Sequence, residues 1–278
     1  MTKKFCLLLL VIAVSVLISP ILTQAKTNTE EIPEKLKIIA IGNSFSSNSL
    51  HHVYEMAKEL GIKDVTVGNL YIGSCSLKKH RINAKNNNKA YKYYKKSAGE
   101  WEITDNVSIS EALADEDWDY VMFLQYSGDA GKTDTYKPLN SLLKYVRKRV
   151  GEDTKFIWNM VWAFQSDYKA KRFEAYNYDQ SLMYKKIVYA TNKKIKTNDK
   201  IDLIIPAGTA IQNARSSSFG DTFTKDGRHL TYAGRYIVGL TLLSKILEIS
   251  PEDIKYCPKS ISNEMREVAV KAALMAVN

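Results

Sequence analysis

The chain has 278 residues, of which 45% are hydrophobic, so it is no disordered protein and can form one large domain with a sizeable core. Its 40 Lys and Arg against 30 Asp and Glu give a charge of +10, and its three cysteines exclude a disulfide scaffold. The basic residues are scattered along the chain, as in "YKYYKK" and "ATNKKIKTNDK". This distribution favours solvated helix faces over a surface that binds anionic cell-wall polymers. We expect no nucleic-acid partner.

The first 25 residues have the pattern of a secretory signal peptide. Two lysines precede an apolar run at residues 5–18, and the small-residue site Thr-Gln-Ala follows at 23–25. The run is short for a membrane span, which needs about 20 residues, so an uncleaved anchor is the weaker alternative. Cys6 lies at the beginning of the apolar run and not at its end, which argues against a lipoprotein. We predict cleavage near Ala25 and an extracytoplasmic protein without stable membrane insertion.

Strands alternate with helices along residues 26–278, which we interpret as a single domain. Near-continuous apolar runs rich in β-branched residues are typical of strands covered on both faces, and they occur at residues 36–42, 64–73, 119–125, 155–162 and 201–208. Helical periodicity occurs between and after them, at residues 49–61, 136–151, 178–195 and 235–250. This alternation predicts an α/β fold with a mostly parallel sheet and helices on both faces.

Two segments fall outside this alternation. Residues 74–117 are polar and lysine-rich, and we expect an irregular insertion or lid over one end of the sheet. Residues 260–278 have helical periodicity, and we predict a C-terminal helix that packs onto the domain rather than onto a membrane. Cys75 and Cys257 could pair in an export compartment, and the sequence leaves both this pairing and the oligomeric state open.

Polar and glycine-rich residues follow each predicted strand. Ligands of open parallel sheets collect at the carboxyl ends of the strands, so these residues are expected to converge on one rim. They are Gly42-Asn43-Ser44, Gly73-Ser74, residues 125–128, residues 162–165 and Gly208-Thr209.

Ser44 is the candidate nucleophile on this rim, because a serine hydroxyl becomes reactive when a histidine oriented by a carboxylate removes its proton. His229 is the candidate base, since it lies three residues after Asp226 in a glycine-containing loop. The order Ser–Asp–His occurs in known triads, but the G-x-S-x-G signature of α/β hydrolases is absent. Taken singly, Ser44 and the Asp226–His229 pair also fit helix capping.

The other histidines give no comparable pattern. His51 and His52 lie close to Glu55 on a predicted helix, as in a surface His–Glu pair. No third and fourth ligand appears at zinc-site spacing, so we expect no metal, and the chemistry requires no organic cofactor. His80 lies in the lysine-rich segment and receives no role.

The blocks around these residues resemble those of the SGNH (GDSL-like) hydrolase superfamily. The resemblance spans about residues 36–248 and rests on "GNSFS", an isolated Gly73, a polar amide after a middle strand and a late D-x-x-H. "YIGSCSL", "PAGTAIQNAR" and "DGRHLTYAGRY" resemble an uncharacterised secreted branch of it. The resemblance implies a flavodoxin-like three-layer α/β/α sandwich that hydrolyses esters. It makes Ser44 the nucleophile, His229 the base, Asp226 its orienter, and the backbone N–H groups of Ser44 and Gly73 oxyanion donors.

Two positions depart from the superfamily pattern. Asn43 stands where an Asp usually precedes the serine, and Gln125 stands where an Asn usually supplies the third oxyanion donor. We predict that the Gln125 amide donates through one more methylene, with Asn159 as the alternative donor. One such donor is worth ~3 kcal/mol of transition-state stabilisation.

Export and resemblance together predict a secreted serine esterase that acts on a small-molecule or glycan ester and removes O-acetyl groups from carbohydrate. The candidate substrate-binding residues at the rim are Trp162, Gln165 and Tyr126. The two aromatic side chains could stack on sugar rings, with core packing as the alternative. A lysophospholipase or thioesterase is the alternative within the superfamily. A glycan-binding protein without hydrolytic activity and a metallophosphoesterase are the alternatives from other classes.

Overall fold

The structure is a computed structural model that describes residues 32–278. The predicted signal peptide and its cleavage site near Ala25 lie outside the described residues. Between residues 32 and 278, no helix is long and apolar enough to cross a membrane.

A seven-stranded sheet with the order β4-β3-β2-β1-β5-β6-β7 forms the centre of the fold. Its five strands β2-β1-β5-β6-β7 are parallel, in the strand order of flavodoxin-like sheets, and β3 and β4 join one edge antiparallel. The strands are β1 Lys35–Gly42, β2 Asp64–Tyr71, β3 Tyr91–Lys96, β4 Glu102–Val107, β5 Tyr120–Phe123, β6 Lys155–Asn159 and β7 Leu203–Ile205. The predicted α/β fold with a mostly parallel sheet is confirmed.

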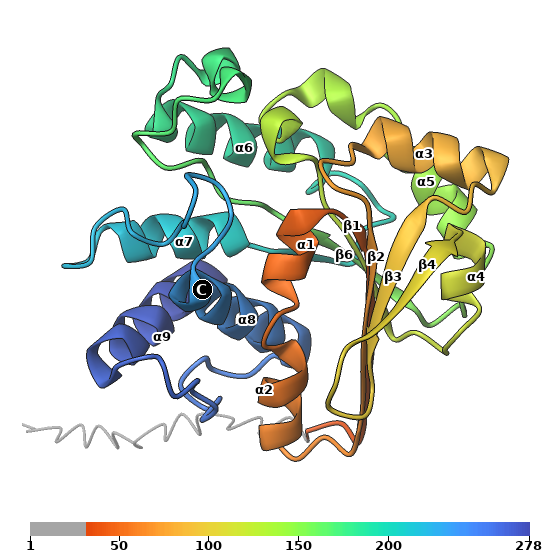
Figure 1. Cartoon of the computed structure of the whole chain (residues 1–278), viewed down its shortest axis with the longest axis horizontal. Coiled ribbons are helices and arrows are strands. Elements are labelled where there is room, and N and C mark those ends of the chain that lie inside the picture. The colour runs from red at the N-terminus through yellow and green to blue at the C-terminus, as the bar shows by residue number, and fades with distance from the viewer. Residues whose placement is uncertain (1–31) are drawn as a thin grey trace, which may run out of the picture.

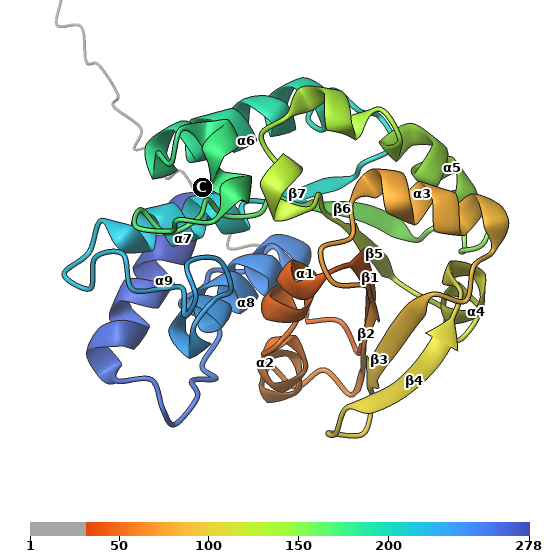
Figure 2. The same ribbon diagram turned by 45° about the horizontal axis from the view of Figure 1, so that its top comes forward.

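Helices cover both faces of the sheet, which makes the predicted three-layer α/β/α sandwich (Figure 1). Helices α1, α2 and α8 lie on one face, with α7 and α9 beside α8, and α3, α5 and α6 lie on the other face with α4 beside α3 (Figure 2). The α-helices are α1 Ser44–Ser49, α2 Val53–Glu59, α3 Leu77–Asn86, α4 Ile109–Leu113, α5 Leu139–Arg147, α6 Gln180–Lys194, α7 Ala207–Arg215, α8 Tyr232–Leu247 and α9 Asn263–Val277. Short 3-10 helices occupy Ser127–Asp129, Thr133–Tyr136 and Lys171–Tyr176.

Burial explains why the central strands have nearly continuous apolar sequences. Residues 38–41 of β1 are at most 1% exposed, because helices cover this strand from both sides. Helix α8 is apolar around most of its circumference because it packs between the sheet, α7 and α9. The predicted C-terminal helix is α9, which begins at the Ser262 cap and packs on α7 and α8.

Residues 74–117 do not form the irregular insertion that their composition predicts. They fold into α3, the β3–β4 pair and α4, and the two strands extend the sheet by antiparallel pairing with β2. In "YKYYKK", Tyr91 and Tyr93 are buried while Lys92 between them is exposed, which is the alternation of a strand. The lysines of β3 pair with acidic side chains, as Lys92 does with Asp105 and Lys95 with Glu116.

The helix predicted at residues 49–61 is two helices. Helix α1 begins at Ser44 and ends at Ser49, and α2 begins at Val53 after a break at residues 50–52. His52 at this break is 1% exposed, and its ring lies 4.7 Å from the ring of Tyr232 on α8. The chain therefore turns here to bury His52 against the last helix of the α/β region.

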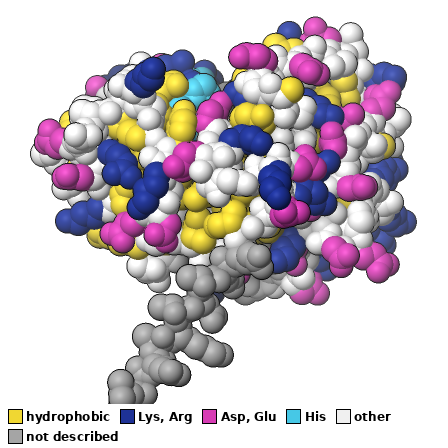
Figure 3. Space-filling view, turned by 90° about the horizontal axis from the view of Figure 1, so that it is seen from below, with side chains coloured by type: hydrophobic (Ala, Val, Ile, Leu, Met, Phe, Trp, Pro, Cys, Tyr) yellow, Lys and Arg dark blue, Asp and Glu magenta, His cyan; other side chains and the backbone are white. Residues whose placement is uncertain are grey.

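The cysteines and the surface charge complete this description. Cys75 is buried and Cys257 is half-buried, and both are free thiols, so the disulfide that the sequence leaves open is not formed. On the face of the molecule in Figure 3, basic and acidic side chains are interspersed rather than gathered into one patch. This distribution fits a solvated surface on that face.

Candidate active site

Ser44 lies at the carboxyl edge of the sheet, directly after β1 and at the first position of α1. Asn43 caps this helix: its Oδ1 accepts a hydrogen bond from Phe45 N at 2.9 Å, and its Nδ2 donates to Cys75 O at 3.1 Å. Gly42 permits the tight turn, because a Cβ there would lie 2.2 Å from Ser46 Oγ. Strand order reverses beside β1, which is where open α/β sheets bind ligands.

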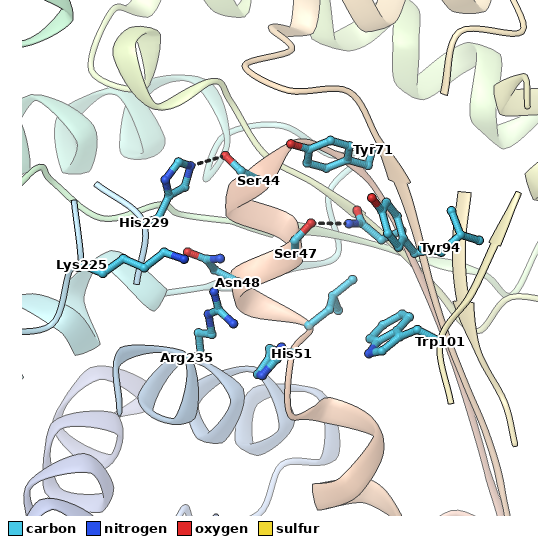
Figure 4. A pocket seen from close by; sticks show the side chains of 13 residues that line it. Ser44, Ser47, Asn48, His51, Tyr71, Tyr94, Trp101, Lys225, His229 and Arg235 are labelled. Carbon is cyan, nitrogen blue, oxygen red and sulfur yellow. Dashed lines mark hydrogen bonds between the residues drawn. The ribbon is translucent and has the colours of Figure 1, made fainter. Parts of the chain in front are cut away.

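The loop before α8 brings a histidine and an aspartate to Ser44. His229 Nε2 lies 2.8 Å from Ser44 Oγ, and His229 Nδ1 lies 2.6 Å from Asp226 Oδ2 (Figure 4). The backbone N–H of His229 donates to the other carboxylate oxygen, Asp226 Oδ1, at 2.8 Å. Three residues predicted from the sequence thus form one hydrogen-bonded chain, across 185 positions between Ser44 and His229.

Several hydrogen bonds fix the loop that carries His229. Trp162 Nε1 donates to Arg228 O at 2.7 Å, Gln165 N donates to Gly227 O at 2.8 Å, and Leu230 N donates to Asn48 Oδ1 at 2.7 Å. Gly227 has φ of +80°, and a Cβ there would meet the Tyr168 ring at 2.3 Å. Residues that follow β6 and a residue of α1 therefore hold the loop that carries the candidate base.

Asp226 is placed to keep its negative charge. Partial burial alone would raise the pKa of its carboxyl, but hydrogen bonds from the backbone and ring of His229 outweigh burial and hold the pKa below its usual range. A carboxylate on Nδ1 leaves Nε2 free to accept the proton of Ser44, because it fixes the tautomer of the ring. The arrangement can therefore perform nucleophilic catalysis by serine.

Gly73 lies in the turn that follows β2. Ile72 N donates to Gly42 O at 3.3 Å, and the Asn43 side chain holds Cys75 O, so the turn at residues 72–75 is fastened to the end of β1. Asn43, a departure from the superfamily pattern, thus links the serine turn to the glycine turn. Tyr71 at the end of β2 is the register partner of Gly42, and its hydroxyl lies 3.5 Å from where a Gly73 Cβ would be.

The structure does not bring Gln125 to this site. Its side chain is buried in another set of hydrogen bonds: Oε1 accepts from Leu77 N at 3.2 Å and Tyr126 N at 2.8 Å, and Nε2 donates to Thr135 O at 3.1 Å. The prediction that Gln125 is the third oxyanion donor is therefore wrong, because its amide N–H groups donate to Thr135 inside the fold. The alternative donor Asn159 is also buried, and its Nδ2 donates to Ser49 Oγ.

Gln125→Ala is therefore expected to destabilise the protein rather than to stop turnover. The substitution leaves the buried backbone N–H groups of Leu77 and Tyr126 without this acceptor, at a cost of about 3 kcal/mol in the free energy of unfolding. Urea denaturation followed by circular dichroism measures this loss. Unchanged stability together with a hundredfold fall in kcat on a short ester would instead restore Gln125 to the oxyanion site.

The three predicted substrate-binding residues have other positions. Trp162 is fully buried and stacks on Phe45 with ring centroids 4.2 Å apart, so it supports the serine helix and the histidine loop from below. Gln165 holds the same loop through Gly227 O and through a hydrogen bond that its Oε1 accepts from Thr224. Tyr126 is half-buried and faces Arg172, and it does not line the cavity beside Ser44. Core packing, the alternative for these aromatic residues, is correct for Trp162.

A cavity of about 510 Å³ opens beside Ser44 and His229. Its floor is α1, one wall consists of aromatic residues from β2, β3 and the segment before β4, and the opposite wall carries Lys225, Arg235 and His51 (Figure 4). The lining residues are Ser44, Ser47, Asn48, Leu50, His51, Asn69, Tyr71, Tyr94, Trp101, Ile103, Lys225, His229 and Arg235. Most of these are residues that the sequence did not indicate.

Some of the lining residues carried a signal in the sequence. Asn48 lies one helical turn after Ser44, where a polar residue on the same helix face can reach the same rim. Tyr94 and Trp101 lie in the segment interpreted as irregular, and recognition of "YKYYKK" as a strand would have placed Tyr94 on the sheet. Arg235 gave no signal, because only tertiary packing brings the start of α8 to this cavity.

His51 and His52 belong to this region but form no pair with Glu55. Glu55 forms an ion pair with Lys96 of β3 instead. Burial lowers the pKa of His52 to about 3, and burial followed by the charge of Arg235 lowers the pKa of His51. Both rings are therefore neutral near pH 7.

Fold and site together define the class: a three-layer α/β protein with a Ser–His–Asp chain at the carboxyl edge of its parallel sheet. Residues 37–276 match the family model described as "Domain of unknown function (DUF4886)". The crystal structure of a DUF4886 family protein from Bacteroides uniformis is 37% identical with a TM-score of 0.84, over 87% of this chain and 95% of that one. The chain belongs to the DUF4886 family.

More distant structures are less similar. A protein from Slackia heliotrinireducens, provisionally assigned to the SGNH hydrolases, is 18% identical with a TM-score of 0.49, over 76% of this chain and 99% of that one. A catalytic mutant of an acetylxylan esterase from Geobacillus stearothermophilus is 11% identical with a TM-score of 0.49, over 78% and 95% of the two chains. The first of these is assigned to the superfamily that the sequence blocks resemble. No curated protein matches this chain in sequence.

Proposed function

We propose that this protein is a serine hydrolase that cleaves carboxylic esters, with Ser44 as nucleophile. The observation that carries the proposal is the chain of hydrogen bonds from Ser44 Oγ through the His229 ring to Asp226, at 2.8 Å and 2.6 Å. Helix capping, the alternative for these residues, requires neither contact. A cap at Ser44 explains nothing about a histidine from the far end of the chain that is directed at its hydroxyl.

The reaction follows from this geometry. Ser44 Oγ attacks the ester carbonyl carbon while His229 Nε2 takes the hydroxyl proton, and the carbonyl oxygen becomes an oxyanion. Collapse of this intermediate breaks the bond to the alcohol oxygen, which receives the proton from His229. A water molecule, deprotonated by His229, then attacks the acyl-serine, and the carboxylic acid leaves as Ser44 regains its proton. Asp226 stabilises the protonated ring in both steps.

The oxyanion needs donors that do not move during the reaction. The backbone N–H of Ser44 is one, since the first position of a helix has no intrahelical acceptor for its N–H. The Gly73 N–H, in the turn fastened to β1, is the second. Tyr71 takes the place predicted for Gln125: it adjoins Gly42 in register, and its hydroxyl points toward the Ser44 end of α1 (Figure 4).

Tyr71→Phe is expected to lower kcat about a hundredfold with little change in KM, because it removes one oxyanion donor and keeps the ring. Steady-state kinetics on a short p-nitrophenyl ester measures this change. Tyr120→Phe, a tyrosine of β5 outside the cavity, is the matched control. Equal kcat values for Tyr71→Phe and the wild type would remove Tyr71 from the oxyanion site.

The substrate that the cavity supports best is an O-acetylated carbohydrate outside the cytoplasm. Tyr94 and Trp101 offer partly exposed aromatic faces in the same cavity as Ser44, which suits sugar rings. Serine, asparagine and histidine side chains on the floor and far wall can hydrogen-bond to hydroxyl groups. The signal-peptide pattern of the first 25 residues supports export, where such glycans occur.

A panel of acetylated oligosaccharides tests this function, with acetate release as the readout and the Ser44→Ala protein as control. Release of acetate by the wild type alone supports a carbohydrate acetylesterase. Faster turnover of long-chain than of short-chain p-nitrophenyl esters would favour a lysophospholipase or thioesterase instead. Binding of these glycans without any acetate release would favour a glycan-binding protein.

A further inference from the structure

The wall of the cavity opposite the aromatic residues carries two cations, Lys225 and Arg235. Lys225 lies on the loop before His229, and Arg235 lies in the first turns of α8. None of the described residues that line the cavity is acidic. Lys225 and Arg235 are therefore the charged groups on the cavity lining itself, and neither takes part in the hydrogen-bonded chain at Ser44.

Arg235 lacks a partner within the described residues. Its Nε is buried without a hydrogen bond, and none of the ion pairs among residues 32–278 includes it. By contrast, the buried Arg215 is paired with Asp221 at 2.7 Å, and the buried Lys96 is paired with Glu55. A guanidinium that is partly withdrawn from water without an anion is costly, unless a ligand supplies the anion.

The neighbours of Arg235 leave this position open to a ligand. Burial lowers the pKa of the Arg235 guanidinium, and its positive charge in turn lowers the pKa of His51 beside it. His51 is therefore neutral and adds no positive charge for binding an anionic ligand, so Arg235 and Lys225 supply the charge on this wall. Figure 4 shows Arg235 and Lys225 on the same side of α1, with Asn48 between them and the aromatic residues on the other side.

We propose that the natural ester carries an anionic group, a carboxylate or a sulfate, which Arg235 and Lys225 bind while the aromatic wall holds the sugar. This rests on the proposed esterase function and adds the substrate class. Arg235 lies toward the His51 end of α1 (Figure 4), and the six residues of α1 span about 9 Å. The anionic group is thus separated from the scissile ester and belongs to an acidic oligosaccharide rather than to the acyl group.

Arginine suits this role because its planar guanidinium forms two parallel hydrogen bonds with a carboxylate or a sulfate. Lysine at the more exposed position 225 adds charge without this geometry. Removal of Arg235 should therefore change the selectivity between acidic and neutral substrates more than removal of Lys225.

A matched pair of substrates tests the proposal. One is an O-acetylated oligosaccharide with a single uronic acid, and the other is the same compound with its carboxylate capped as a methylamide. We expect the wild type to have a kcat/KM at least about tenfold higher for the acid, and this ratio to fall as salt is added. A third arm, a sulfated acetylated oligosaccharide, tells which anion is preferred.

Arg235→Gln is expected to bring the ratio of acid to methylamide close to one. Lys225→Gln should reduce this ratio of kcat/KM values partly, and it provides an independent test if Arg235→Gln does not fold. Lys245→Gln, an equivalent change near the other end of α8, is the control that keeps the ratio. A wild-type ratio near one, or an unchanged ratio in Arg235→Gln, would overturn the acidic substrate and leave the esterase intact. Absence of any Ser44-dependent acetate release would overturn both.

Discussion

Ser44→Ala is expected to reduce turnover of every ester substrate by more than about ten-thousand-fold, because within residues 32–278 no other hydroxyl forms a hydrogen bond to His229 Nε2. Binding should survive, since the oxyanion donors and the cavity walls remain. The measurement is kcat under saturating substrate, with direct binding of an acetylated oligosaccharide by calorimetry.

Two controls make the Ser44→Ala result specific. The melting temperature should stay close to that of the wild type, because Ser44 is only half-buried and its hydroxyl bonds to His229 alone among the described residues. Ser141→Ala, the same change on the exposed face of α5, should leave kcat unchanged. Residual activity of a tenth or more in Ser44→Ala would mean that another group attacks the ester.

His229→Ala has the second of the two largest expected effects, again a loss of about ten-thousand-fold or more in kcat. Without the ring, Ser44 keeps its proton and the alcohol leaves without one. Added imidazole should restore part of the activity, because the space left by the ring opens onto the cavity beside Ser44.

Asp226→Asn separates the role of the base from that of its orienter. It is expected to slow turnover by a comparable or smaller factor than His229→Ala, since the amide can hold the ring in the wrong tautomer. Full activity in His229→Ala would contradict the triad, whatever the result for Asp226.

The catalytic chain could be predicted because each part is local. Ser44 follows a recognisable strand, and Asp226 and His229 lie three residues apart in a short loop, so pattern alone brings each to the rim. The five parallel strands were predictable for the same reason, since a strand buried on both faces has a nearly continuous apolar sequence. The antiparallel β3 and β4 were missed because the segment that contains them is polar, and the lysines of β3 interrupt its apolar pattern.

The side chains around the catalytic chain could not be predicted, because a position after a strand does not fix where a side chain points. Gln125 follows β5 as expected, yet it turns toward the start of α3 and the Thr135 turn, where backbone groups need partners. Trp162 follows β6 but packs beneath Ser44 and His229. Arg235 enters the cavity only because α8 packs against α1 and α2, a contact between distant parts of the chain.

Covalent labelling with a fluorophosphonate, followed by peptide mass mapping, tests the central claim most directly. A serine activated by a histidine displaces fluoride from this reagent, whereas an ordinary helix-capping serine does not react. The account predicts one phosphonate adduct per protein on the peptide that contains Ser44, and no adduct in Ser44→Ala or His229→Ala. A folded wild-type protein that remains unlabelled, or an adduct on any other residue, would contradict it.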